Sequence, residues 1–457
     1  MAVKVALIYP YFHPANDNSI FRFPPLGLGY LAANLQKNGF EVELVDCTFL
    51  RHSQAVKKIL DAKPQIAGFY CMFSMKKTAL QLAQTIKSQI EEECLFVVGG
   101  PLPSWSPEGF LGVFDVVAVG EGEETMVELA QAVAQKKPLP DIKGIVYRGS
   151  DRLIMSPPRP FIENLDSLAF PTRELFDNTT YKKYYKTQFG YTTTSMITSR
   201  GCPFSCDFCS RPIFGADMRT RSVGNIVDEV EEIAGLGYER VWFADDCFTL
   251  NNKHIIAICE EIKRRSLDIG WECLSRVDTM DTEVATAMKS SGCIRVFFGI
   301  ESGNNSVLGI MNKHITTSQA KNAVKVAKAA GLKAGAFFIL GYPGETDKTV
   351  LETIRFASAL PLDYLSFTMP YPIPGTPLYE RVKGHGVSLE DWEEPKNYHL
   401  IRHKLLYESG FSEGKLKFAI AKAQAQFYGR KILKEGGYRV LGMPFERLTD
   451  YAFMRMH

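Results

Sequence analysis

The sequence lacks long apolar runs and a secretion signal. Its longest apolar segments, such as residues 334–340, have the length of a strand, whereas a membrane-spanning helix needs roughly 18 apolar residues or more. The N-terminal stretch MAVKVALIYPYF has no cleavable signal pattern and is interpreted as a first β-strand. These absences predict a cytoplasmic protein without a transmembrane segment.

An excess of charge of one sign is also missing. The 53 basic and 51 acidic residues leave a net charge of +2. Such a balance gives no reason to expect nucleic acid or an anionic membrane as an obligatory partner, because proteins that bind either one concentrate positive charge. Hydrophobic residues make up 46% of the 457 positions. This share indicates a packed globular protein, long enough for two or three domains.

Cysteine is scarce for this length, and its ten residues do not suggest a disulfide framework. Three of them stand together in the stretch SRGCPFSCDFCSRP, at the spacing C-x3-C-x2-C: Cys202, Cys206 and Cys209. The other seven flank apolar segments and are interpreted as buried free thiols: Cys47, Cys71, Cys94, Cys247, Cys259, Cys273 and Cys293.

Three thiolates on one loop can ligate a single metal centre. On a [4Fe–4S] cluster they leave one iron without a protein ligand, open to a substrate or cofactor. A zinc knuckle is the alternative, but structural zinc requires four ligands. The nearest further candidates are Cys247 and His254, which are distant in sequence. The spacing therefore favours an iron–sulfur cluster.

Residues 1–145 alternate short apolar strands with helical patterns, which predicts a parallel sheet covered on both faces. The expected strands cover residues 3–10, 41–47, 65–71, 95–100 and 116–120, and the helices between them cover 26–38, 53–62, 75–91 and 123–135. Ligands bind such sheets at the carboxyl ends of the strands. The loops at those ends are 10–25, 72–76, 99–105 and 120–125.

Residues 146–190 are interpreted as a connector, after which a second strand–helix series occupies 191–385. Its expected strands cover residues 192–199, 240–246, 269–276, 295–301, 333–341 and 363–370. Six consecutive units fit a partial (β/α)6 barrel better than an open sheet, although the pattern alone does not separate the two. Residues 386–457 are expected to form a helical C-terminal region. The predicted class is α/β, a Rossmann-like (flavodoxin-like) domain followed by a partial barrel.

The cysteine motif, with Phe208 directly before its last cysteine, resembles that of the radical S-adenosylmethionine (SAM) superfamily. The resemblance covers the whole second series. It implies that SAM chelates the open iron and that the reduced cluster cleaves SAM to methionine and a 5′-deoxyadenosyl radical. It also implies anaerobic chemistry and an external electron donor, such as ferredoxin or flavodoxin.

The resemblance extends to polar residues at successive strand ends, which would hold SAM together with Phe208. An acid after the second strand would hold the amino group, Arg276 the carboxylate and Glu301 the ribose hydroxyls. The usual Gly-Gly-Glu is Ala-Asp-Asp here, which leaves open whether Asp245 or Asp246 takes the acidic role. The remaining matches are Ser275, Ser302, Leu340 and Gly341.

The first domain resembles the cobalamin-binding domain fused to one large class of radical SAM enzymes. Four glycines at strand ends would let backbone approach the bulky cofactor: Gly99, Gly100, Gly120 and Gly122. Leu26, Gly27 and Glu121 would border it as well. The cobalt-binding motif Asp-x-His-x-x-Gly is absent. The lower face of cobalamin is therefore expected to meet the loop after the third strand, which consists of Met72, Phe73, Ser74 and Met75.

Together these features predict a cobalamin-dependent radical SAM C-methyltransferase. The deoxyadenosyl radical would take hydrogen from an unactivated carbon of an unidentified substrate, a peptide or a small molecule, and methylcobalamin would donate the methyl group. The chain as a whole has a general similarity to methanogen enzymes that methylate a glutamine carbon in methyl-coenzyme M reductase. That similarity rests on no single motif.

Four alternatives remain. The same architecture serves a tetrapyrrole cyclase or hydratase, or a lipid or hopanoid methylase. A methylthiotransferase would need a second cluster on three cysteines of the first domain, but residues 10–25 contain none. A non-enzymatic cobalamin or redox sensor is disfavoured by the open iron site and the polar strand ends.

Overall fold

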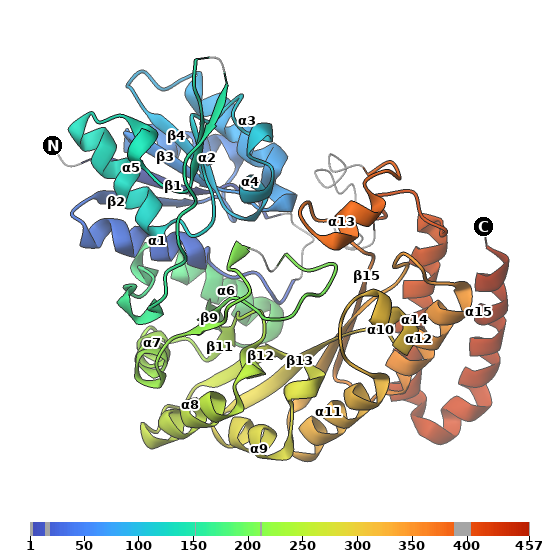
Figure 1. Cartoon of the computed structure of the whole chain (residues 1–457). Coiled ribbons are helices and arrows are strands. Elements are labelled where there is room, and N and C mark those ends of the chain that lie inside the picture. The colour runs from blue at the N-terminus through green and yellow to red at the C-terminus, as the bar shows by residue number, and fades with distance from the viewer. Residues whose placement is uncertain (1–2, 14–18, 151, 211–212, 388–403, 457) are drawn as a thin grey trace.

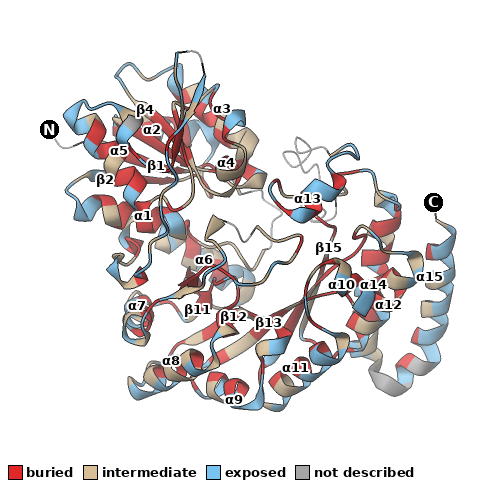
Figure 2. Cartoon of the chain, viewed as in Figure 1, coloured by how far each residue is buried: buried red, intermediate tan, exposed pale blue. Residues whose placement is uncertain are grey.

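The computed structural model describes residues 3–13, 19–150, 152–210, 213–387 and 404–456. Two mainly parallel sheets, each flanked by helices, stand next to one another (Figure 1). The helices turn buried faces toward the sheets and exposed faces outward (Figure 2). The predicted α/β class is confirmed.

The first sheet has seven strands in the order β2-β1-β3-β4-β5-β6-β7. Its parallel strands are β1 (Lys4–Tyr9), β2 (Glu41–Asp46), β3 (Ile66–Tyr70), β4 (Leu95–Gly99) and β5 (Val116–Ala118). The helices are α1 (Leu26–Lys37), α2 (His52–Ala62), α3 (Lys76–Lys87), α4 (Pro101–Trp105) and α5 (Glu123–Gln135). Two apolar cores form because these strands are apolar on both faces: α2 and α3 cover one face, and α1 and α5 cover the other.

The first sheet extends beyond the boundary expected at residue 145. Strands β6 (Ile145–Arg148) and β7 (Leu153–Met155) add to it in antiparallel pairing. The boundary expected from the sequence therefore falls inside the sheet. The segment interpreted as a connector also contains α6 (Asn178–Phe189), whose Tyr181 hydroxyl donates to Asp46 over 2.7 Å.

The second sheet has six parallel strands in the order β15-β14-β13-β12-β11-β8. The strands are β8 (Thr193–Met196), β11 (Arg240–Phe243), β12 (Gly270–Ser275), β13 (Cys293–Glu301), β14 (Lys333–Ile339) and β15 (Tyr364–Thr368). The helices are α7 (Val223–Gly235), α8 (Asn252–Arg264), α9 (Thr282–Ser290), α10 (Asn305–Ile310), α11 (Thr317–Ala329) and α12 (Asp347–Ala359). A short ribbon of β9 (Ser199–Arg200) and β10 (Arg219–Thr220) stands beside this partial barrel.

An aromatic layer lines the inner side of the second sheet. Residues of one strand point alternately to opposite faces, so Trp242, Phe297 and Phe337 point away from the helix-covered core that holds their neighbours. Phe21, from the loop after β1, packs against all three at ring distances of 5.1, 5.7 and 6.2 Å. The loop after β1 of the first domain therefore packs against the inner side of the partial barrel.

The C-terminal region is helical, as expected. It comprises α14 (Glu413–Gly437), a π-helical segment (Tyr438–Gly442) and α15 (Met443–Arg455), with α14 packed against α12. The short helix α13 (Pro377–Val382) lies before it. Within the described ranges, no helix combines the length and apolar character that crossing a membrane would require.

Candidate functional site

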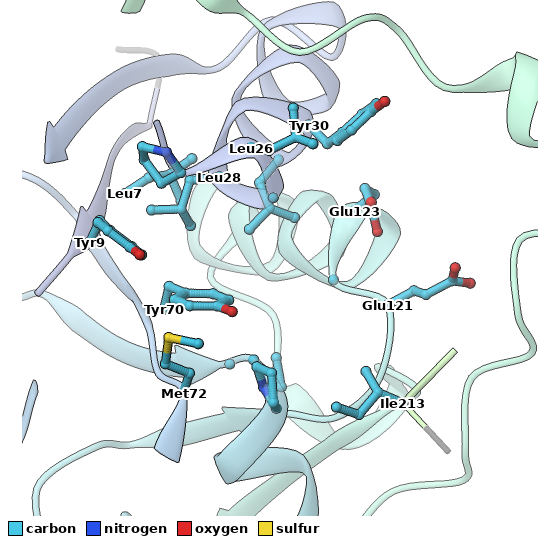
Figure 3. A pocket seen from close by; sticks show the side chains of 18 of the residues that line it. Leu7, Tyr9, Leu26, Leu28, Tyr30, Tyr70, Met72, Glu121, Glu123 and Ile213 are labelled. Carbon is cyan, nitrogen blue, oxygen red and sulfur yellow. The ribbon is translucent and has the colours of Figure 1, made fainter. Parts of the chain in front are cut away.

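A cavity of about 680 Å³ lies between the carboxyl ends of the first sheet and the second domain (Figure 3). This volume is typical of sites for large organic ligands. The first domain contributes the ends of its strands and the loops before α1 and α5. The second domain contributes Ile197, Arg200, Ser210, Ile213, Phe214, Ala244 and Asp246.

Glycines form much of the cavity wall. The predicted residues Gly27, Gly99, Gly100, Gly120 and Gly122 all line the cavity. At Gly27, an added Cβ would meet no protein atom within 4 Å, so the missing side chain leaves room for a ligand. Gly100 has a different role: its φ is +108°, and a Cβ there would approach the Cys71 carbonyl oxygen to 2.7 Å.

Of the four loop residues expected to meet the lower face of cobalamin, Met72 lines the cavity. The other three need correction: Phe73, Ser74 and Met75 form a 3-10 turn that does not line the cavity, and Met75 is buried in the core. Tyr70, which was not expected, lines the cavity with Met72, because alternate residues along the end of β3 point toward it. The alternation was readable in the sequence, but the turn after it was not.

Tyrosines of the cavity wall were not predicted from the sequence. Tyr9 and Tyr70 lie with their rings 5.7 Å apart, and Tyr30 lines the cavity from α1 (Figure 3). Burial raises the pKa of Tyr70 to about 12, so its phenol stays protonated at neutral pH. Among the predicted border residues, Leu26 and Glu121 do line the cavity.

A buried ion network joins the two domains at the cavity. Arg200 donates to Glu121 over 2.8 Å and also to Glu123, and all three side chains are almost fully buried. Arg219, paired with Arg200 across the β9–β10 ribbon, bonds Glu121 at 3.0 Å. Two cations therefore face two carboxylates, a balance that buried charges require.

The three motif cysteines lie on a loop that begins two residues after Arg200. Cys202 is buried, while Cys206 and Cys209 are half-buried. Burial, with added repulsion from Asp246 and Cys206, raises the pKa of the Cys202 thiol. Gly201, with φ +90°, lets the backbone before Cys202 pass close to the Asp217 carbonyl oxygen. A Cβ at Gly201 would clash with that oxygen.

Within the described ranges, no three Cys, His, Asp or Glu side chains converge as a single bound ion requires. In a [4Fe–4S] cluster each thiolate binds a different iron, so the three sulfur atoms need not converge on one point. The loop can therefore still hold the cluster that its cysteine spacing predicts.

Cationic side chains surround the cysteine loop. Arg276 stacks over the Phe204 ring at 3.5 Å and pairs with Asp278 at 2.9 Å. Lys313 pairs with Glu301 at 3.0 Å. Burial opposes both cations, yet their carboxylate partners and the nearby Cys206 raise the pKa of each. An anionic group bound here would meet two fixed positive charges.

The structure distinguishes Asp245 from Asp246. Asp245 is buried, its Oδ1 accepts bonds from Thr198 and Ser199, and burial raises its pKa to about 6. Asp246 lines the cavity and is exposed there, although surrounding protein raises its pKa too. Asp246 is therefore the acid that a bound molecule can reach.

Several other predicted SAM residues do not line this cavity. Ser275 and Ser302 are buried and bond Thr249 and Thr353. Leu340 is fully buried, and Gly341 would place a Cβ 2.4 Å from Leu416. Phe208 is half-buried, with its ring 6.4 Å from that of Tyr342. Small and polar residues at strand ends also serve as local packing and capping groups, which explains the ambiguity.

Two family models match the chain. The B12 binding domain matches residues 14–130, and the radical SAM superfamily matches residues 196–357. An uncharacterized methyltransferase of Pyrococcus horikoshii is 36% identical over 89% of this chain and 88% of its own length. An anaerobic magnesium-protoporphyrin IX monomethyl ester cyclase of Rubrivivax gelatinosus is 29% identical over 86% of this chain and 72% of its own length.

Two solved structures share the fold. The cobalamin-dependent SAM radical enzyme OxsB, with aqua-cobalamin and SAM bound, aligns with 98% of this chain and 72% of its own at a TM-score of 0.77 and 21% identity. The radical SAM methyltransferase TsrM from Kitasatospora setae, with cobalamin and a [4Fe–4S] cluster, aligns over 84% of this chain and 75% of its own at 0.69 and 20% identity.

Proposed function

Because the chain belongs to the radical SAM enzymes that carry a B12-binding domain, we propose that it methylates an unactivated carbon of its substrate. Its cofactors are a [4Fe–4S] cluster, SAM and cobalamin. When bound, the cluster and SAM supply a hydrogen-abstracting radical, and cobalamin supplies the methyl group. The observation that carries the proposal is the single cavity shared by the glycine-lined strand ends and Asp246.

The proposed cobalamin site is the glycine-lined part of the cavity. Gly27, Gly99, Gly100, Gly120 and Gly122 line it, and an added Cβ at Gly27 or Gly120 would meet no protein atom within 4 Å. Tyr70 and Met72 would face the cofactor from the end of β3. No histidine lines the cavity in the described chain, which suits a cobalt that must change its coordination easily.

The proposed SAM site lies where the cysteine loop meets the cavity. Cys202, Cys206 and Cys209 would ligate the cluster. Arg276 would bind the carboxylate of SAM, since its planar guanidinium matches a carboxylate. Asp246 would accept from the amino group, and its position on the cavity supports this role over Asp245.

The protein's own contribution to the chemistry is distance, orientation and exclusion of water. Phe21 lines the cavity and packs on Trp242, Phe297 and Phe337, and this aromatic layer would help to keep water away from a reactive radical. The Arg200 network would hold the two cofactor loops at a fixed separation.

The experiment uses protein reconstituted anaerobically with iron, sulfide and cobalamin, and SAM labelled in its methyl group. With dithionite or reduced flavodoxin as electron donor, it should form 5′-deoxyadenosine and retain corrinoid through gel filtration. If no 5′-deoxyadenosine forms, the proposed radical chemistry is wrong. If the protein retains no corrinoid under a saturating supply, cobalamin is not the source of the methyl group. A first substrate to assay is a peptide with a glutamine side chain, with label transfer detected by mass spectrometry.

Ring formation is a second candidate, because one relative carries the name of a ring-forming cyclase. It would consume SAM and give a product without the labelled methyl group. A methylthiotransferase is less well supported, because its second cluster would need a cysteine in the loop after β1, and residues 10–25 contain none.

A further inference from the structure

The C-terminal helices carry most of the exposed apolar side chains of the molecule. Of the twelve large hydrophobic residues exposed in the described chain, nine lie between Tyr428 and Met454. They occupy the end of α14, the π-helical segment and α15: Tyr428, Ile432, Val440, Leu441, Met443, Phe445, Leu448, Tyr451 and Met454. Such a concentration marks an interaction surface.

On α15 these residues share one face of the helix. Leu448, Tyr451 and Met454 follow one another at spacings of three residues, which places them on one side. Their exposed fractions are 67%, 55% and 53%. Figure 1 shows α15 at the edge of the molecule with no element outside it, and Figure 2 shows its outer side exposed.

The opposite face of α15 is polar and turned inward. Asp450 pairs with Arg355 and with Lys422, whose side chain is almost fully buried. Glu446 accepts from Arg430 at 3.0 Å and from the Tyr438 hydroxyl at 2.8 Å. A helix of a water-soluble protein normally turns its apolar face inward. Apart from the buried Phe453, α15 does the reverse.

The charges around the outer face are positive. Arg447 and Arg455 on α15 are exposed, and no described carboxylate forms an ion pair with either of them. The guanidinium of Arg455 lies over the Tyr451 ring at 4.4 Å, so cation and aromatic face the same side. The acids of α15, in contrast, are both occupied by inward partners.

We propose that the outer face of α15 docks on an anionic lipid surface. An exposed apolar helix face with unpaired cations is the pattern of helices that lie in the plane of a membrane interface. Each basic side chain near an anionic surface adds attraction. A second copy of the chain is a poorer occupant, because the two arginines of each copy would face those of the other across a two-fold axis.

The test uses the full cofactor-loaded chain in a vesicle flotation assay. Vesicles of phosphatidylcholine alone are compared with vesicles containing equal parts phosphatidylglycerol. The protein should float with the anionic vesicles, float much less with the neutral ones, and be released by salt because the attraction is partly electrostatic. Absence of flotation, or equal flotation with both compositions, overturns the proposal.

Variants separate the two contributions of this face. Leu448→Asp with Tyr451→Asp removes the apolar contact, and Met155→Asp, which replaces a residue 71% exposed on β7, is the matched control. Arg447→Gln with Arg455→Gln removes the charge, and Lys57→Gln with Lys253→Gln is its control. Each α15 pair should weaken vesicle binding about tenfold or more, while the controls bind as the parent does.

Circular dichroism and 5′-deoxyadenosine formation show whether each variant is folded and loaded. α15 pairs that stay folded and bind vesicles as the parent does overturn the proposal. A dimer in light scattering that Leu448→Asp dissociates, together with no vesicle binding, also overturns it and assigns the face to a second copy.

Discussion

Arg200 and Glu121 form a buried ion pair that connects the loop before the cysteines to the loop of the glycine-lined cavity. Their atoms are 2.8 Å apart, and 3% and 2% of the side chains are exposed. Arg200 lies two residues before Cys202, and Glu121 lies between Gly120 and Gly122. One contact therefore ties the proposed cluster loop to the proposed cobalamin loop.

Replacing Arg200 with methionine should destabilise the fold strongly. The variant leaves Glu121 and Glu123 buried with too little positive charge, a loss of about 3 to 5 kcal/mol in the free energy of unfolding. Urea unfolding followed by circular dichroism measures it. Arg265→Met is the control, since Arg265 makes equally close pairs with Glu261 and Asp228 at the surface. Arg265→Met should lower the free energy of unfolding by less than about 1 kcal/mol. Equal losses in the two variants would show that burial does not make the Arg200 pairs more important.

Replacing Gly27 with alanine should weaken cobalamin binding without harming the fold. Gly27 lines the cavity, and a Cβ there would meet no protein atom within 4 Å. Alanine also favours a helix over glycine by about 0.8 to 1 kcal/mol. Equilibrium titration with cobalamin should show weaker binding, while the unfolding midpoint is unchanged or higher. Gly224→Ala on α7, equally free of neighbours but outside the cavity, should bind cobalamin normally.

The stability of an Asp245→Asn variant should change with pH relative to the parent. Burial raises the pKa of Asp245 from 3.8 to about 6 in the folded state, so the folded protein binds the proton more tightly. Parent stability from this group is present below pH 4 and is lost as the pH rises to about 6. Asparagine keeps the acceptor for Thr198 and Ser199 but carries no charge.

Unfolding midpoints of parent and Asp245→Asn between pH 4 and 8 test this effect. The unfolding midpoint of the variant should rise relative to that of the parent as the pH increases to about 6. Above about pH 7 the difference between the two midpoints should no longer change. The control is Asp363→Asn, because the pKa of Asp363 is lowered: its bonds to Lys328 and Ala334 outweigh its burial. The Asp363 carboxyl titrates below this pH range. The difference in unfolding midpoint between Asp363→Asn and the parent should therefore stay constant. A pH-independent difference for Asp245→Asn would refute the assignment.

Each motif cysteine should be required for the iron–sulfur cluster. Cys202→Ser, Cys206→Ser or Cys209→Ser removes one of three thiolates and should lower iron and sulfide content to a small fraction of the parent value. The brown absorbance should fall with it. Cys94→Ser, which changes a half-buried thiol of the first domain, should leave the iron content unchanged. Retention of a full cluster in any motif variant would disprove the ligand set.

Two variants should separate SAM binding from cluster assembly. Arg276→Lys removes the planar guanidinium that pairs with Asp278 and stacks on Phe204, and Asp246→Asn removes the acid on the cavity. Each should raise the Kd for SAM about tenfold, the effect of about 1.4 kcal/mol, with iron content unchanged. Asp268→Asn, an exposed acid elsewhere, should bind SAM as the parent does. If both variants bind SAM with the affinity of the parent, Arg276 and Asp246 do not belong to the SAM site.

The local features of this protein follow from the sequence itself. The cysteine spacing, the alternation of strands and helices and the glycines at strand ends depend on neighbours a few residues apart. Such patterns predict the two series of strands and the family. They also predict Gly27, Leu26 and Glu121 at the cavity, because parallel strands end at the same edge.

Only the tertiary structure decided which side chains face the cavity. Asp245 and Asp246 are equivalent in sequence, but the strand end points one inward and the other into the cavity. The turn of Phe73, Ser74 and Met75 folds away and leaves Tyr70 and Met72 exposed to the cavity. The carboxylates that bond Arg200 are 77 and 79 residues away in the sequence. The apolar face of α15 is turned outward because its acidic face forms ion pairs with the body of the protein. These features depend on contacts between distant segments, which no local pattern encodes.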